Sequence, residues 1–189
     1  MKIGIFGGSF NPPHNMHKDI ALELLEKNYL DKIIYIPTGD NYKKKELINF
    51  YDRYNMVKLM IKDNDKLLIS DIGNNDDYKY TYQVLDYFKE NNNDIYFICG
   101  SDNLTDFINW MNYEYILKNY KLLVIKRNKD NIEEILKMYK NYKTNIILAN
   151  IESKVLSSSY IRDNIKNDVK DYLDNDVYEY IKKKSLYKR

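Results

Sequence analysis

The sequence predicts an α/β fold, in which helices cover both faces of a doubly wound, mostly parallel sheet. Two observations predict it. Short apolar runs rich in β-branched residues alternate at least five times with segments whose apolar residues recur at helical spacing. The chain has 189 residues, which suits one α/β domain with a substantial core and is short for two. We therefore expect a single domain over residues 1–189, with a C-terminal helical segment from about residue 157 packed on it.

Six apolar runs are the expected strands. In chain order they are Ile3–Phe6, Lys32–Pro37, Leu67–Ile69, Ile95–Cys99, Lys121–Lys126 and Ile146–Leu148. The expected helices are Met16–Leu25, ending near Asn28, then Phe50–Lys62, residues 80 to about 91, residues 131 to about 142, a helix beginning at Ser157, and Tyr172–Tyr187. Because helical crossovers make the strands parallel, their carboxyl ends should meet at one edge of the sheet, where ligands bind in open α/β sheets.

Charge and cysteine content limit the classes of partner. The chain carries 30 basic and 28 acidic residues, so no strong field favours nucleic acid or an anionic membrane. The single cysteine, Cys99, lies in an apolar run and cannot form an internal disulfide, which fits a reducing compartment. No apolar run approaches transmembrane length, and the first strand leaves no room for a signal peptide. We expect a cytoplasmic protein without nucleic-acid or membrane partners, and leave a homo-oligomer open.

The residues with the most chemistry follow the first strand. Two glycines lead into a Pro-Pro loop and then to the only two histidines, His14 and His17. Unpaired N–H groups and the positive dipole end at a helix start favour an anion, and glycines let phosphate approach the backbone. If the helix begins near Asn15, both imidazoles face the same side of its first turn. This predicts a phosphate site. The alternative is that one histidine caps or packs and the other is exposed.

Two later segments offer cations and hydroxyls. Lys43, Lys44 and Lys45 follow the second expected strand; such a triplet is usually a solvated face, but it stands where ligands bind. Ser157 or Ser158 is a hydroxyl cap for a helix whose first turns carry Arg162. A cap alone would account for the serines, but hydroxyls, first-turn N–H groups and a guanidinium also form an anion site.

The two ends of the chain resemble a pair of known signatures. Residues 7–17, GGSFNPPHNMH, resemble the GxFxPxHxGH motif of the adenylyl- and cytidylyltransferases, with Met16 where that family usually has glycine. Residues 156–162, LSSSYIR, resemble its ISSTxIR motif. Between and after them, YTY at 80–82, GSDNL followed by Trp110, LLVIKR ending at Arg127, VYEYI and SLY are similar to the nicotinate-nucleotide adenylyltransferase branch. The resemblance covers essentially the whole chain.

This resemblance implies a Rossmann-like fold and an adenylyl transfer in NAD biosynthesis. The 5′-phosphate of nicotinate mononucleotide would attack the α-phosphorus of ATP, releasing pyrophosphate and forming deamido-NAD. The attacking phosphate is already an anion, so no protein nucleophile is needed. Catalysis then rests on positioning and on stabilising charge on the leaving group. Mg²⁺ would arrive mainly with ATP, and no metal ligand is assigned to the protein.

The resemblance also implies roles for particular residues. Catalysis is assigned to His14, His17, Lys44 and Arg162. Contacts with ATP are expected from Gly7, Gly8, Ser9, Phe10, His14, His17, Gly100, Asp102, Ser157, Ser158, Ile161 and Arg162. Contacts with the acceptor are expected from Ser9, Lys44, Thr81, Trp110, Met111 and Asn112, with the pyridine ring stacked on Trp110.

Thr81 and Asp102, and one further residue that matches the family, have simpler structural explanations. Thr81 is a good N-cap residue, and Asp102 is either the N-cap of the following helix or a ligand to a ribose hydroxyl or metal. Arg53 matches an arginine that the family carries at the start of the 50–62 helix, although a surface salt bridge would explain it equally well.

Other functions stay in view. A sibling transferase acting on nicotinamide mononucleotide, phosphopantetheine or glycerol phosphate would keep both signatures. The last two would have no reason for YTY or the segment from GSD to Trp110. A dinucleotide-dependent oxidoreductase would need the GxGxxG spacing, which GIFGGSF lacks. A non-catalytic nucleotide-binding regulatory protein is the alternative of another class, and Met16 is its only support.

Overall fold

A single parallel sheet of six strands runs through the molecule. The computed structural model describes residues 1–41, 46–89, 93–127, 131–151 and 156–188. The strand order is β3-β2-β1-β4-β5-β6, and every neighbouring pair is parallel. The strands are β1 (Lys2–Gly8), β2 (Lys32–Pro37), β3 (Leu67–Ile69), β4 (Asp94–Gly100), β5 (Lys121–Ile125) and β6 (Ile146–Ala149). All six lie where the apolar runs predict them.

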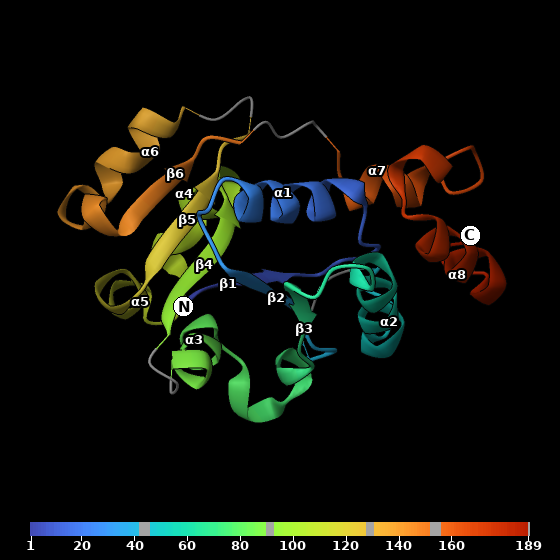
Figure 1. The fold of residues 1–189 in the computed structure, drawn as a ribbon, viewed down its shortest axis with the longest axis horizontal. Helices are drawn as coiled ribbons and strands as arrows, with labels where there is room; N and C mark the ends of the chain where they lie inside the picture. The colour runs from blue at the N-terminus through green and yellow to red at the C-terminus, as the bar shows by residue number, and fades with distance from the viewer. Residues whose placement is uncertain (42–45, 90–92, 128–130, 152–155, 189) are drawn as a thin grey trace.

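Helices lie on both sides of this sheet (Figure 1). The α-helices are α1 (Asn15–Glu26), α2 (Phe50–Ile61), α3 (Thr81–Lys89), α4 (Ser101–Asp106), α5 (Tyr113–Asn119), α6 (Ile132–Met138), α7 (Ser158–Asp163) and α8 (Asn175–Lys184). Short 3₁₀ turns are η1 (Ile72–Asn74), η2 (Asp76–Tyr78), η3 (Phe107–Asn109), η4 (Lys140–Asn145) and η5 (Lys170–Tyr172). Over the described ranges, no helix combines the length and the apolar character needed to span a membrane.

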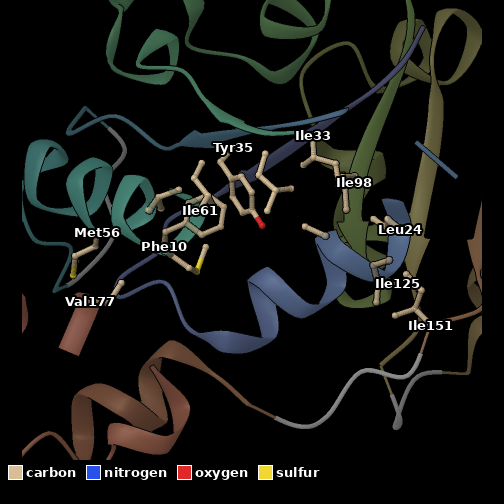
Figure 2. Packing of buried hydrophobic residues seen from close by; sticks show 14 of the residues in the cluster. Phe10, Leu24, Ile33, Tyr35, Met56, Ile61, Ile98, Ile125, Ile151 and Val177 are labelled. Atoms are coloured by element: carbon tan, nitrogen blue, oxygen red, sulfur yellow. The ribbon is translucent and has the colours of Figure 1, made fainter. Parts of the chain in front are cut away.

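Alternate residues of each central strand build two separate cores. In β2, Ile33 and Tyr35 belong to one buried cluster, whereas Ile34 and Ile36 belong to the other. The first cluster joins the sheet to α1, α2, α7 and α8, and Figure 2 shows part of it. The second joins the opposite face to α3, α4, α5 and α6. The predicted doubly wound α/β architecture is confirmed, and buried residues on both faces explain why the strands read as continuous apolar runs.

The strand order reverses direction between β1 and β4. From β1 the chain builds outward to β2 and β3, then returns to place β4 on the other side of β1 before continuing to β5 and β6. Loops that leave the carboxyl ends of β1 and β4 therefore run to opposite sides of the sheet. Such a point leaves a crevice outside the strand ends, and it is where doubly wound folds bind ligands.

Two helices are shorter than the sequence predicts. The C-terminal helix begins at Asn175 instead of Tyr172, because the Asp174 side chain caps it by accepting from the Asp176 N–H at 3.0 Å. It ends at Lys184, and Ser185 adopts a left-handed conformation with φ of 53°. The helix expected from 131 to about 142 ends at Met138, and the tighter η4 turn replaces its last part.

Close backbone packing at two glycines gives a first test. A Cβ on Gly73 would lie 2.3 Å from the Pro37 carbonyl oxygen, whereas a Cβ on Gly7 would make an ordinary 3.5 Å contact with Phe97. We expect Gly73→Ala to lower the free energy of unfolding by about 1–3 kcal/mol, because main-chain atoms must move. Gly7→Ala should change it by less than about 1 kcal/mol. Urea unfolding measures both, and equal effects would contradict the packing argument.

Candidate active site

A cleft of about 890 Å³ opens at the carboxyl ends of β1 and β4. It gathers residues that the sequence analysis assigned to nucleotide or acceptor from four separate parts of the chain. Those that line it are Gly7, Gly8, Ser9, Phe10, His14, His17, Thr81, Gly100, Asp102, Trp110, Met111, Ser157 and Ser158. Ile161 is fully buried in a core cluster, and neither Arg162 nor Asn112 lines the cleft. Lys44 falls outside the described residues.

The two histidines form a stacked pair at the start of α1. The helix begins at Asn15, as predicted, and the two ring centroids are 3.8 Å apart. The His14 N–H donates to Nδ1 of His17 at 3.2 Å, so a neutral His17 carries its proton on Nε2. The Tyr35 hydroxyl donates to the His17 carbonyl at 2.8 Å and holds the turn against the sheet. The pair is therefore a fixed source of N–H donors at a helix N-terminus.

Burial keeps both imidazoles neutral near pH 7. Desolvation, followed by the positive charge of Arg127, lowers the pKa of His14 to about 4. Desolvation also lowers the pKa of His17 well below its ordinary value, and His14 and Arg127 add to the effect. Nδ1 of His14 is buried and has no hydrogen-bond partner among the described residues. A phosphate entering the cleft would meet neutral donors, and its charge would raise both pKa values.

The residues of α7 dock on the loop that precedes the histidines, residues 9–14, which we call the histidine loop. Ser157 is the N-cap of α7 and accepts from the Tyr160 N–H at 3.2 Å. Ser158 Oγ donates to the Pro12 carbonyl at 2.8 Å. Arg162 Nη1 donates to the Asn11 carbonyl at 2.8 Å. The two signature segments therefore touch directly although about 150 residues separate them.

The far end of the cleft is aromatic. The Trp110 ring meets Phe97 edge-on at 5.7 Å between centroids and tilts against Phe107 at 5.0 Å. Thr81 is the first residue of α3 and not its N-cap, so that prediction is wrong. Tyr80 stands immediately before the helix. Its main-chain N–H donates to Gln83 Oε1 at 3.0 Å, which is one half of a capping box. Thr81 still places the N-terminus of α3 at the wall of the cleft.

An exposed ion pair stands at the ends of β4 and β5. Asp102 Oδ1 lies 3.3 Å from Arg127 Nε, with about half of each side chain exposed. One alternative made Asp102 the N-cap of α4, and it is wrong. The helix begins one residue earlier, at Ser101, with Gly100 in the cap position. An exposed pair of this kind contributes little to stability, so both groups are free to turn toward a ligand. Arg127 had no predicted role, although a cation directly after a strand is a signal that could have found it.

Arg53 is buried, in contrast to the surface salt bridge that would have explained it. Its side chain has no exposed area, and Nε donates to the Ile48 carbonyl at 2.9 Å. Nη1 donates to the Ser9 carbonyl at 3.1 Å, and Nη2 pairs with Asp40 Oδ1 at 3.2 Å. The guanidinium therefore joins the loop after β1 to the loop after β2 and does not face the cleft.

Comparison with known proteins agrees with this geometry. The family model for cytidylyltransferase-like proteins matches residues 5–164, which include both signatures and the strands between them. The chain belongs to the cytidylyltransferase-like family. Two bacterial relatives carry the name "probable nicotinate-nucleotide adenylyltransferase". The one from Clostridium tetani is 39% identical over 99% of both chains, and the one from Caldicellulosiruptor bescii is 36% identical over 100% of both.

A solved structure extends the likeness to three dimensions. The nicotinic acid mononucleotide adenylyltransferase of Plasmodium falciparum, complexed with NaAD, superposes with a TM-score of 0.83 and 27% identity. The match covers 98% of this chain and 97% of that one. The family's second histidine usually follows a glycine; here Met16 fills that place, where it is buried and lines the cleft beside His14 and His17.

The buried histidines of this family member predict a loss of stability in acid. Because the pKa of His14 is about 4 when folded and about 6.5 when unfolded, the unfolded chain takes up a proton first as the pH falls below 6.5. The free energy of unfolding should therefore fall by about 2 kcal/mol between pH 7.5 and pH 5 from His14 alone. Urea unfolding at the two pH values measures it. The fall should be smaller in His14→Gln, and an identical pH dependence in the two proteins would refute the assignment.

Proposed function

We propose that the protein transfers AMP from ATP to nicotinate mononucleotide, giving deamido-NAD and pyrophosphate in NAD biosynthesis. One observation carries the proposal: a single cleft joins a histidine pair at a helix N-terminus to an aromatic pocket beside the start of α3. The first part suits nucleotide phosphates, and the second suits a flat ring with an anionic substituent. The printed names of the full-length relatives support the choice of acceptor.

The reaction needs positioned donors more than a base. The acceptor phosphate attacks the α-phosphorus in line, and negative charge grows on the departing pyrophosphate. His17 offers its Nε2–H, and the N-terminal N–H groups of α1 offer further donors. Arg127 lines the cleft, Arg162 holds the histidine loop through the Asn11 carbonyl, and Lys44 is retained from the sequence analysis as a further cation. Fixed donors of this kind require no reorganisation as charge develops.

We include Mg²⁺ in the proposal only as an ion that arrives bound to ATP. The described residues contain no group of three histidine, cysteine, aspartate or glutamate side chains able to hold a metal, and Asp102 is the one carboxylate among the described residues that line the cleft. This donor set fits Mg²⁺, which keeps several waters and binds through substrate phosphates with one or two carboxylates. When bound, the ion would neutralise phosphate charge, and Asp102 would hold one side of its water shell.

The acceptor is tested by one assay. Purified protein is incubated with ATP, magnesium and, separately, nicotinate mononucleotide, nicotinamide mononucleotide and phosphopantetheine, while pyrophosphate release is followed. Release with nicotinate mononucleotide supports the proposal. Release only with another acceptor replaces it by a sibling transferase, and no release with any of them favours the non-catalytic nucleotide-binding protein that Met16 had suggested. The cytoplasmic location stays a prediction, and the oligomeric state stays open.

We call His17 and Arg162 the phosphate clamp: His17 is a proposed donor to the leaving group, and Arg162 holds the histidine loop through the Asn11 carbonyl. Removing either side chain should cause a large loss of activity. His17→Ala or Arg162→Ala should each lower kcat/KM by about two orders of magnitude or more, as the loss of an oxyanion donor does. Steady-state kinetics measure this. Lys118→Ala, which removes an exposed cation paired with Glu114 on α5, serves as the control and should leave kcat/KM unchanged. Activity within about threefold of wild type in both clamp variants would end the clamp hypothesis.

The acceptor pocket predicts a preference for the acid over the amide. A helix N-terminus supplies N–H donors, which suit a carboxylate, whereas an amide also needs an acceptor for its NH₂ group. With α3 starting at the cleft wall, kcat/KM for nicotinate mononucleotide should exceed that for the amide at least about tenfold. The Asn112 side chain, which could accept from an amide, does not line the cleft.

Trp110→Ala tests the same pocket separately. It should weaken the use of both acceptors and leave the affinity for ATP nearly unchanged, because the ring would stack only on the pyridine. Parallel acceptor kinetics and ATP titrations measure both. Better use of the amide by wild type would contradict the acid preference, and unaltered acceptor kinetics in the variant would contradict the pocket.

A further inference from the structure

Asn11 is a buried junction in the histidine loop. Only 3% of the residue is exposed, and its side-chain amide is hydrogen-bonded to other segments of the chain. Nδ2 donates to the Glu46 carbonyl at 2.9 Å, and Oδ1 accepts from the Ile48 N–H at 3.4 Å. Its own main-chain carbonyl accepts from Arg162 at 2.8 Å. One side chain three residues before His14 is therefore bonded to the loop after β2, while its backbone is bonded to α7.

The fourth partner comes from the other end of the chain. The Tyr187 hydroxyl donates to Asn11 Oδ1 at 2.9 Å. Burial raises the pKa of this hydroxyl, so it stays protonated and remains a donor. Because the Ile48 contact is long, the tyrosine supplies the shorter of the two hydrogen bonds that hold the amide oxygen in place.

The chain reaches this position through an unusual turn after α8. Ser185 and Tyr187 both adopt positive φ values, 53° and 62°, which L residues rarely do. Between them, the Leu186 N–H donates to the Ile181 carbonyl at 3.0 Å and closes the turn. Leu186 and Tyr187 then pack on the cluster that contains Phe10. Non-glycine residues in this conformation persist only where the surroundings hold them, and such strain collects at functional sites.

We propose that Tyr187 is a positioning residue of the transfer reaction, which holds the Asn11 amide and through it the histidine loop in the conformation that presents His14 and His17 to the nucleotide. The proposal rests on the proposed function. It gives a role to the SLY segment, which the sequence analysis singled out and the cleft does not use. In Figure 1 the C-terminal elements lie on the side of the molecule where α1 begins, next to α2.

The test is Tyr187→Phe, which removes one hydroxyl and keeps the ring. We expect kcat with saturating ATP and nicotinate mononucleotide to fall about tenfold, while both KM values stay within about twofold. The thermal midpoint should change by only a few degrees, about what one hydrogen bond contributes in a chain of this size. Tyr178→Phe is the matched control, since this ring packs from α8 on the same core and its hydroxyl makes no bond to the histidine loop. It should leave kcat unchanged.

A second readout does not depend on turnover. His14 and His17 are the only histidines in the chain, so the imidazole region of an NMR spectrum reports on the site alone. Tyr187→Phe should shift or broaden the imidazole signals, and Tyr178→Phe should not. Added to Asn11→Ala, Tyr187→Phe should cause no further loss of kcat, because both act through one contact.

Two results would overturn the proposal. One is an unchanged kcat with unchanged imidazole signals, whether or not the midpoint falls, because Tyr187 would then be a structural anchor only. The other is an independent, additive loss in the double variant. A wild-type protein that releases no pyrophosphate with nicotinate mononucleotide would defeat the proposed function instead, and the imidazole spectra of the two tyrosine variants would still decide whether Tyr187 positions the loop.

Discussion

The guanidinium of Arg53 is the contact on which the geometry of the site depends most. A buried cation is costly unless its donors are satisfied, and here they bond the Ser9 and Ile48 carbonyls and the Asp40 carboxylate. The planar fork of arginine can hold several acceptors in fixed directions, which lysine cannot do. Because Ser9 directly follows the two glycines that end β1, the Arg53 side chain fixes where the phosphate-binding turn begins relative to the second strand.

Side chains from elsewhere in the chain also bond other main-chain carbonyls of the histidine loop. Residues 9–14 have left the sheet and are not yet in α1, so they have no regular backbone partners, and buried carbonyls in such a segment must be bonded by something else. Arg53 bonds Ser9, Arg162 bonds Asn11 and Ser158 bonds Pro12. Hydrogen bonds from side chains in distant parts of the chain thus take the place of the regular backbone hydrogen bonds of a strand or helix. Positioning catalysis requires such rigidity, because small misplacements of donors cost large factors in rate.

Local pattern predicted the strands and, within one residue, the start of α1, because each depends on residues close in sequence. It failed where a long-range contact decides the role. Nothing beside Arg53 in the sequence indicates that it would be fully buried, and Asn11 reads as an ordinary loop residue before two prolines. The cap roles offered as alternatives for Thr81 and Asp102 are wrong, because α3 begins at Thr81 itself and Gly100 holds the cap position of α4; both residues line the cleft, as their predicted roles in the site require.

The charged groups in and around this cleft differ in burial, and those that are buried have a different role from those that are exposed. Arg53 and Arg162, mostly buried, bond main-chain carbonyls and shape the loop, whereas Arg127 and Asp102 are about half exposed and pair with each other. The two histidines are also buried, and burial together with the nearby cation keeps them neutral. An incoming nucleotide therefore meets neutral donors already in place and an exposed cation able to turn toward its phosphates. This arrangement allows the donors to strengthen as negative charge grows, because the imidazoles themselves carry no buried positive charge before the nucleotide binds.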